Sequence, residues 1–362
     1  MNKVLVTGGA GFIGSNFVRY LLNVEPEVTI VNLDVLSYAG SMENLRTLPD
    51  PSRHFFVKGD ICDRALVDDL LHRHQIDTIV HFAAETHVDR SIHDPHAFLR
   101  TNVVGTWTLL EAARQFWLVE KGLPEKTVRF HHISTDEVFG ALKENEPAWT
   151  EDTPYSPNSP YAASKASADH WVRSYGHTYG LPFTMTNCSN NYGPQQFPEK
   201  LIPLMVLNAI EGKPLPIYGD GAQIRDWLYV EDHCEAIWLV IRKGKPGESY
   251  NIGGGSQPKN IEVVEHLCAA LDEALPTSVN VPHTSLIRFV TDRPGHDRRY
   301  AIDISKIKGQ LGWQPRQSLG SGLQKTVEWY LGHPEWLAAI RQQQEYQTWM
   351  ERNYAERGRE NL

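Results

Sequence analysis

Short apolar runs alternate with helical patterns along the first half of the chain. Strand-like runs are predicted at 3–7, 28–33, 54–58, 78–82, 128–133 and 183–186. Helical periodicity follows the first run through Phe17, Leu21 and Leu22, and further helices are predicted at about 64–74, 95–117 and 161–179. Strands and helices that alternate in this order are typical of an α/β fold with a doubly wound parallel sheet.

The pattern changes from about Asn190 onward, where Pro, Gly and polar residues become frequent. We therefore expect the sheet domain over 1–189 and a smaller α/β substrate-binding domain over 190–340. The chain is expected to cross back to the first domain near 226–256, and 341–362 is predicted to be a polar, helical tail. Basic residues gather near predicted loops of the second part, and a guanidinium suits a pyrophosphate because it offers two donors. These basic residues are Lys200, Arg225, Arg288, Arg293, Arg298 and Arg299, of which Arg225 and Arg293 are the favoured pair.

A glycine-rich stretch follows the first predicted strand and opens the first helix. Strand, glycines and helix in this order are the context that a dinucleotide-binding fingerprint requires. Gly8 permits the tight turn, Gly11 lets the backbone approach a pyrophosphate, and Gly14 lets the helix pack on the strand. The helix N-terminus then supplies N–H donors and a partial positive charge to the phosphates. The sheet is therefore predicted to be of the Rossmann type.

The second run ends in Asp34, twenty residues after Gly14. A carboxylate in this position accepts hydrogen bonds from the adenosine ribose hydroxyls, although an Asp here also suits a turn or a helix cap. Because it repels a 2′-phosphate and no Arg lies among residues 35–37, the expected cofactor is NAD rather than NADP. Residues 59–61 and 83–85, after the third and fourth strands, are expected along the adenine and the dinucleotide; alone, each also suits a plain turn.

The fifth run ends in a hydroxyl and two adjacent carboxyl groups, at Thr135, Asp136 and Glu137. Such residues commonly cap the next helical turn. Downstream, Tyr161 and Lys165 lie four residues apart on one face of a predicted helix. An ammonium near a phenol lowers its pKa, which makes the tyrosine a competent base, and the lysine is also placed to hold the nicotinamide ribose. A Y-x-x-x-K pair often arises by chance, but beside a complete fingerprint it predicts a catalytic pair.

Composition excludes several classes of function. The formal net charge of -9 over 362 residues argues against general nucleic-acid binding, which needs a basic surface. Four cysteines without C-x-x-C spacing argue against a zinc site or a disulfide framework and indicate a reducing compartment. The sequence shows neither a signal peptide nor an apolar run long enough to span a bilayer. We therefore expect a soluble, cytoplasmic protein with no metal and no membrane partner.

These motifs together resemble the extended short-chain dehydrogenase/reductase family. Within that family, four segments resemble the 4,6-dehydratases that act on dTDP-glucose, at 134–140, 188–194, 225–230 and 292–297. The resemblance covers nearly the whole chain and leaves only the C-terminal tail outside it. Its specific element is the pair Asp136-Glu137, because sugar epimerases of the family generally lack the pair and GDP-mannose dehydratases typically carry only the Glu.

The resemblance implies an NAD-dependent hydro-lyase that converts dTDP-glucose to dTDP-4-keto-6-deoxyglucose and water, in deoxysugar biosynthesis of the dTDP-rhamnose and lipopolysaccharide type. Tyr161 would take the proton of the C4 hydroxyl, which Thr135 positions. Glu137 would remove the C5 proton, and protonated Asp136 would donate to the departing C6 hydroxyl. Two neighbouring carboxyl groups in a confined site do not both ionise cheaply, which favours one acid and one base.

The resemblance also implies a set of binding residues. Those expected at the cofactor are Gly8, Gly11, Phe12, Ile13, Gly14, Asp34, Ser37, Asp60, Ile61, Ala83, Ala84, Glu85, Thr101, Tyr161, Lys165 and Asn191. Those expected at the nucleotide sugar are Thr135, Asn190, Lys200, Leu201, Pro216, Tyr218, Arg225, Asn260, Asp292, Arg293, His296 and Tyr300.

Members of the family commonly dimerise through a four-helix bundle, here built from 95–117 and 161–179. Trp107, Phe116 and Trp171 suit such an interface and suit a core equally well. Three alternative functions stay open: a 4,6-dehydratase for another nucleotide hexose, a 4-epimerase, and an NAD-binding sensor without turnover.

Overall fold

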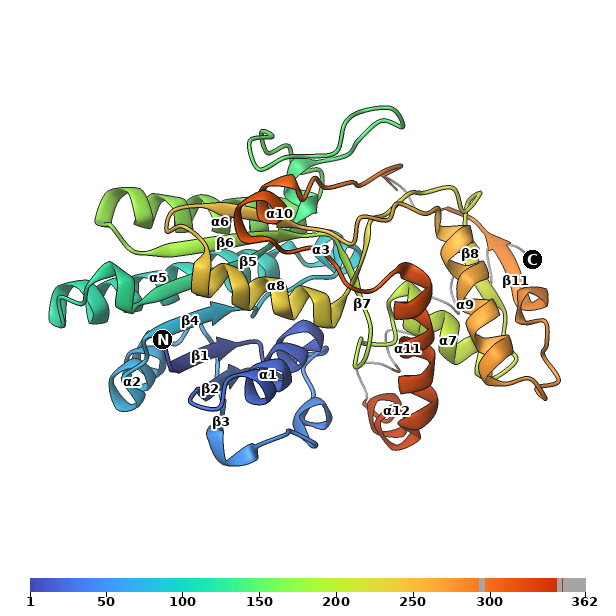
Figure 1. Ribbon diagram of the computed structural model, residues 1–362, viewed down its shortest axis with the longest axis horizontal. Coiled ribbons are helices and arrows are strands. Elements are labelled where there is room, and N and C mark those ends of the chain that lie inside the picture. Colours follow the sequence, from blue (N-terminus) through green and yellow to red (C-terminus); the bar gives the residue numbers. More distant parts are fainter. Residues whose placement is uncertain (293–296, 344–346, 348–362) are drawn as a thin grey trace.

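The computed structural model describes residues 1–292, 297–343 and 347, and a seven-stranded parallel sheet forms its centre (Figure 1). The sheet has the order β10-β6-β5-β4-β1-β2-β3, and every neighbouring pair is parallel. All six predicted strands belong to it, which confirms the fold class. Their bounds are β1 Lys3–Thr7, β2 Thr29–Asp34, β3 His54–Lys58, β4 Thr78–His81, β5 Arg129–Thr135 and β6 Phe183–Cys188.

The seventh strand, β10 (Ser249–Ile252), pairs with β6 and was not among the predicted strands. It is four residues long, and two of these residues are polar, so it lacks the apolar run that marks the other strands. Between β6 and β10 the chain builds other elements, so β10 joins the sheet from much later in the sequence. The short pair β7 (Asn190–Tyr192) and β9 (Trp227–Tyr229) forms along this path.

Helices cover both faces of the sheet. The helices α1 (Phe12–Val24) and α8 (Val230–Lys243) share one apolar cluster with the sheet. A second cluster, on the other face, contains residues of α2 (Arg64–His74), α5 (Thr106–Ala113) and α6 (Pro160–Tyr179). The helix predicted at 64–74 coincides with α2. The two layers leave the sheet accessible at the ends of its strands.

The helix predicted at 95–117 exists, but it is less regular than expected. It starts as α4 (Pro95–Phe98), widens into π-helical turns at Leu99–Gly105, continues as α5 and widens again at Arg114–Glu120. A Cβ on Gly105 would come within 2.4 Å of the Ile61 side chain, so the helix lies close against the loop after β3. The hydrophobic pattern of the sequence does not distinguish π-helical turns from α-helical turns. The π-helical turns are frequent at functional sites.

The later part of the chain packs around its own apolar cluster, to the right in Figure 1. Its two-stranded sheet pairs β8 (Leu215–Tyr218) with β11 (Ile287–Val290) in parallel. Helix α8 and strand β10 carry the chain back to the central sheet, while the division into domains stays a prediction. The remaining elements are α3 Val88–His93, α7 Leu201–Ile210, α9 Asn260–Ala274, α10 Ser305–Leu311, α11 Leu319–Gly332 and α12 Pro334–Arg341.

The strand order reverses between β1 and β4, so the loops that follow these strands diverge. Ligands of open α/β sheets bind at such a point, beyond the carboxyl ends of the strands. Gly8, Asp34, Ala83 and Asp136 follow or end four of the strands at this edge. Within the described ranges no helix is both long and apolar enough to cross a membrane. Most of the predicted tail, 341–362, lies outside the described residues.

Candidate active site

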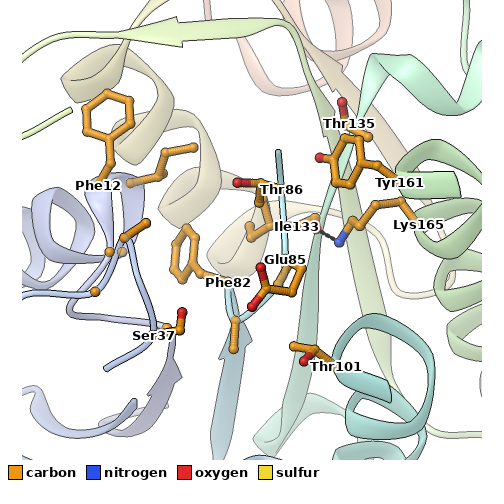
Figure 2. Close-up of a pocket in the computed structure, with 18 of the residues that line it drawn as sticks. Phe12, Ser37, Phe82, Glu85, Thr86, Thr101, Ile133, Thr135, Tyr161 and Lys165 are labelled. Carbon is orange, nitrogen blue, oxygen red and sulfur yellow. Dashed lines mark hydrogen bonds between the residues drawn. The ribbon is translucent and has the colours of Figure 1, made fainter. Parts of the chain in front are cut away.

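A cavity of about 620 Å³ opens at this edge of the sheet (Figure 2). Every residue expected to bind the cofactor lines it, and so do the five expected catalytic residues. Figure 2 shows Phe12 and Ser37 on one side, Glu85 in the middle, and Thr135, Tyr161 and Lys165 on the other side. The cavity is therefore elongated: Phe12, which follows the glycine-rich turn, lies at one end, and Thr135, Tyr161 and Lys165 lie at the other.

The glycine-rich turn leaves no room for side chains. Gly8 has a φ of +73°, and its N–H donates to Leu33 O at 2.9 Å. A Cβ on Gly14 would lie 2.3 Å from Gly8 O, so only glycine lets α1 pack this closely on the turn. The N-cap of α1 is Gly11, which has no side chain to occupy the first N–H groups. These donors and the positive end of the helix fit a pyrophosphate.

Asp34 ends β2 and is buried at the cavity wall. Its Oδ2 accepts from Ala10 N at 2.9 Å and its Oδ1 from Leu36 N at 2.8 Å. Burial raises the pKa of Asp34, and these two N–H donors lower it. Each carboxylate oxygen has a further lone pair, so the group still fits two ribose hydroxyls. The turn interpretation is right as well, because the same carboxylate fixes the loop after β2.

The opposite end of the cavity lies where β5 passes into a short 3₁₀ turn, Asp136–Phe139. Thr135 is the N-cap of this turn: its Oγ1 accepts from Glu137 N at 3.3 Å and lies at hydrogen-bonding distance, 3.3 Å, from Asp136 Oδ1. The capping interpretation is thus correct for Thr135. It also places the two carboxyl-bearing residues beside the threonine hydroxyl.

Asp136 is 2% exposed, and its Oδ2 has no hydrogen-bond partner within the described structure. Burial raises the pKa of Asp136 well above its usual value, and the charges of Glu137 and Asp226 raise it further. Burial and the neighbouring negative charges therefore favour the protonated form of Asp136.

Tyr161 lies in the first turn of α6, and Lys165 follows one turn later. Lys165 Nζ donates to Ile133 O at 2.7 Å, as the dashed line in Figure 2 shows. Burial raises the pKa of the Tyr161 phenol well above its usual value, Glu137 raises it further, and a hydrogen bond with Thr135 lowers it. The expected lowering by Lys165 is therefore not what the protein groups produce, because burial outweighs a lysine whose ammonium is turned to a main-chain carbonyl.

The residues expected at the nucleotide sugar fall into two groups. Thr135, Asn190 and Lys200 line the cavity, and Leu201 starts α7 directly after it. The other members that the structure describes lie beyond the cavity lining, where Arg225 Nη2 donates to Asp297 O at 2.9 Å and the guanidinium lies 4.2 Å over the Tyr300 ring. Pro216 and Tyr218 belong to β8, Asn260 starts α9, and Asp292 Oδ2 accepts from Gln223 Nε2 at 2.9 Å.

Electrostatics connects this second group to the cavity. Arg225 lowers the pKa of Asp136, and the charge of Glu137 raises that of Tyr300. Arg225 and Tyr300 are held together by the main chain, since Tyr300 N donates to Ile224 O at 3.1 Å. Arg293 and His296 lie outside the described residues.

Several cavity residues were missed at the sequence level. Phe82 and Thr86 line the cavity and flank the segment 83–85, which is expected at the dinucleotide. Their place next to that segment is the sequence signal that could have identified them. Arg100 pairs with Asp60 at 2.6 Å, and Tyr38 and Glu199 approach the cavity from distant parts of the chain. Asp226 lies outside the cavity lining and is fully buried, and burial raises its pKa to about 7. It directly follows Arg225, but no separate sequence signal marks it.

The described part of the chain holds no group of three or more His, Cys, Asp or Glu side chains arranged for a metal. All four cysteines are free thiols. The donors that converge on the cavity are main-chain N–H groups, hydroxyls, an ammonium and carboxyl groups. This set fits an organic dinucleotide.

The family of GDP-mannose 4,6 dehydratases matches residues 5–326. The chain belongs to this family. A dTDP-glucose 4,6-dehydratase from Shigella flexneri is 54% identical over 360 residues, which cover 97% of this chain and 99% of the relative.

Solved structures show the same fold with two different activities. A dTDP-glucose 4,6-dehydratase from Bacillus anthracis str. Ames, in complex with NAD, has a TM-score of 0.82 at 45% identity, covering 94% of this chain and 100% of that chain. A UDP-glucose 4-epimerase from Thermotoga maritima has a TM-score of 0.79 at 29% identity, covering 92% of this chain and 99% of that chain. The fold alone therefore does not decide the reaction.

Gly14→Ala should weaken NAD binding at least about tenfold, or about 1.4 kcal/mol. The added Cβ meets a main-chain oxygen, so α1 has to move away from the turn that holds the pyrophosphate. Isothermal titration calorimetry with the cofactor-free protein measures the effect. Gly309→Ala, where a Cβ meets open space within helix α10, is the matched control. Unchanged affinity in Gly14→Ala would contradict the assigned role of the turn.

Proposed function

We propose that this protein is an NAD-dependent dTDP-glucose 4,6-dehydratase. The observation that carries the proposal is the pair Asp136-Glu137 at the end of β5, beside Thr135, Tyr161 and Lys165 in the same cavity. A hydride-transfer site needs only the last three. An adjacent acid and base are what the removal of water requires in addition. The product is dTDP-4-keto-6-deoxyglucose.

Each catalytic side chain has a role that its surroundings support. The glycine turn, Asp34 and Lys165 would hold NAD, which when bound would supply a hydride acceptor at C4 of the sugar and a hydride donor at C6. Tyr161, hydrogen-bonded to Thr135, removes the proton of the C4 hydroxyl. Once C4 is a ketone the C5 proton is acidic, and Glu137 removes it and returns a proton to C5 when the hydride is added at C6. Asp136, which burial keeps protonated, donates to the departing C6 hydroxyl.

The high pKa of the Tyr161 phenol limits the first step. A phenolate forms in this cavity only when positive charge offsets the burial and the charge of Glu137. Lys165 supplies part of that charge, and the positive nicotinamide ring of the oxidised cofactor suits the remainder. Tyr161 is therefore expected to become an effective base in the loaded site. The two carboxyl groups serve only the steps after oxidation.

Turnover of dTDP-glucose that carries deuterium at C4 tests the proposal. We expect the label at C6 of a 4-keto sugar, because the same cofactor takes the hydride and returns it within one molecule. NMR of the product locates the label. Retention of the label at C4 with inverted configuration would instead identify a 4-epimerase, and absence of turnover on any nucleotide hexose would identify a sensor. Parallel reactions with other nucleotide hexoses test the base preference.

Asp136→Asn should slow water elimination by about 10²- to 10⁴-fold and leave C4 oxidation largely intact. The amide keeps the shape of the carboxyl group but has no acidic proton to donate. Single-turnover absorbance should then show reduced cofactor accumulating before any keto-deoxy sugar forms. Asp152→Asn, at an exposed position, is the control for the substitution itself. Equal slowing of oxidation and elimination would reject the acid assignment.

We also propose that the protein acts as a homodimer in the cytoplasm. The helices α5 and α6 pack side by side at the outer end of the molecule in Figure 1. Trp107 and Trp171 are each 41% exposed on them, and Val104 is 43% exposed, which leaves an apolar surface suited to a partner. Phe116 is only 2% exposed and belongs to the core instead.

The cytoplasmic location is supported by the cysteines. Four free thiols suit a reducing compartment.

The double variant Trp107→Glu/Trp171→Glu should raise the dissociation constant of the dimer at least about tenfold. Two carboxylates on the paired helix surfaces meet their symmetry copies and lose hydration. Sedimentation velocity over a range of concentrations measures the change. Val279→Glu, at a residue that is 97% exposed in the other part of the chain, should leave the dimer intact. A wild-type protein that sediments as a monomer would refute the interface.

A further inference from the structure

Asp169 is a fully buried carboxylate that none of the proposed chemical steps uses. It lies on α6, one turn after Lys165. Its Oδ2 accepts from Ser134 Oγ at 2.7 Å and from Tyr155 OH at 2.8 Å, and its Oδ1 lies 3.1 Å from His132 Nε2. Asp169 therefore ties α6 to the end of β5 and to the loop that carries Tyr155.

The charge of Asp169 acts on Lys165. The lysine is 5% exposed, and burial lowers its pKa, while Asp169 raises it. Burial alone would raise the pKa of Asp169, but contact with His132 and the charge of Lys165 bring it below its usual value. An ammonium and a carboxylate are thus buried together. Removing one of them leaves an uncompensated buried charge, which is strongly unfavourable.

Burial favours the neutral forms of the histidine, cysteine and tyrosine side chains around the pair. Burial lowers the pKa of His132 to about 4, and that of His81 falls well below its usual value for the same reason. Burial raises the pKa of the Cys188 thiol to about 12. The phenol of Tyr155 has a raised pKa through burial, and Arg173 Nη2 donates to its oxygen at 3.1 Å. Asp169 is thus the buried carboxylate on α6 that balances Lys165.

Asp169 also acts on the position of the catalytic threonine. Ser134, which donates to Asp169, immediately precedes Thr135, and the ammonium of Lys165 is bound to Ile133 O on the same strand. Asn187 Nδ2 donates to Thr135 O at 3.1 Å from the neighbouring strand β6. The end of β5 is thereby held from α6 and from β6. A displacement of Ser134 would move the threonine, its cap contact with Glu137 and the site of oxidation together.

We propose that Asp169 is a positioning residue of the reaction: its carboxylate, one helical turn from Lys165, is the negative charge buried beside that lysine and holds the strand end that bears Thr135. This inference rests on the proposed dehydratase function, because it assigns Asp169 a role in the oxidation step. Its distinctive consequence is a dependence on pH. Lys165 serves the reaction as an ammonium, so activity is lost as pH rises through its pKa, and Asp169 sets where that loss occurs.

Asp169→Asn should move the alkaline limb of the kcat profile to lower pH by about one pH unit or more. The amide oxygen can replace Oδ2 and accept from Ser134 and Tyr155, while the amide nitrogen faces His132, so the change removes mainly the charge. Tyr155→Phe is the matched control, because it removes one hydrogen bond to Asp169 and leaves the charges of Asp169 and Lys165 in place. The alkaline limb of its kcat profile should therefore stay at the wild-type pH. A purely structural role would lower kcat equally at every pH.

A second measurement reports on Lys165 without turnover. In protein with isotope-labelled lysine, heteronuclear NMR follows the titration of the Lys165 ammonium, whose signal is identified by its loss in Lys165→Arg. That titration should shift to lower pH in Asp169→Asn, and Asp169→Glu, which keeps the charge, should stay near wild type. If Asp169→Asn fails to fold, Asp169→Glu alone decides. A Lys165 titration in that variant that lies one pH unit or more from the wild-type titration would overturn the proposal.

The outcomes separate this inference from the proposed function. A wild-type protein that does not convert dTDP-glucose refutes the function, whatever the NMR titration shows. An active wild type whose alkaline limb and lysine titration are both unmoved in Asp169→Asn refutes the role of Asp169 and leaves the dehydratase intact. Shifts in both measurements, with Tyr155→Phe unchanged, support the inference.

Discussion

The site depends on the parallel pairing of β1, β2, β4 and β5, which ends four strands at one edge of the sheet. A different kind of group stands at the end of each strand: a glycine turn, the carboxylate of Asp34, a small-residue segment and a hydroxyl followed by two carboxyl groups. A one-residue slip of any strand would turn these side chains to the wrong face. The main-chain hydrogen bonds between the strands therefore determine the order in which these groups line the cavity.

Burial is the second determinant, and it acts on acids and bases in opposite directions. It favours the protonated form of Asp136, which suits the proposed acid, and it opposes the ionised forms of Tyr161 and Lys165, which the proposed oxidation step needs. The charge of Asp169 offsets this effect at Lys165. A low-polarity cavity is thus useful for elimination and costly for oxidation, and the site balances the two.

Much of this arrangement was predictable because it is local in sequence. The glycine turn, Asp34 and the residues at 83–85 are recognised from what precedes them, a short apolar strand, and all of them line the cavity. What is assembled from distant segments was not predictable: the polar strand β10, the buried Asp226, and the approach of Tyr38 and Glu199. The pKa of Tyr161 was misjudged for a related reason, since four-residue spacing places Lys165 on the same helix face but does not show that its ammonium binds Ile133 O.

The late arrival of β10 has a consequence for how the protein is made. Until Ser249–Ile252 have been synthesised, β6 is an edge strand with unpaired N–H and C=O groups, although every residue of the dinucleotide turn is already in place. An emerging chain therefore holds an incomplete sheet while the nucleotide-sugar region is still being translated. Nascent or truncated forms that stop before β10 would expose that edge to pairing with other chains, which makes aggregation during synthesis a hazard of shortening this protein.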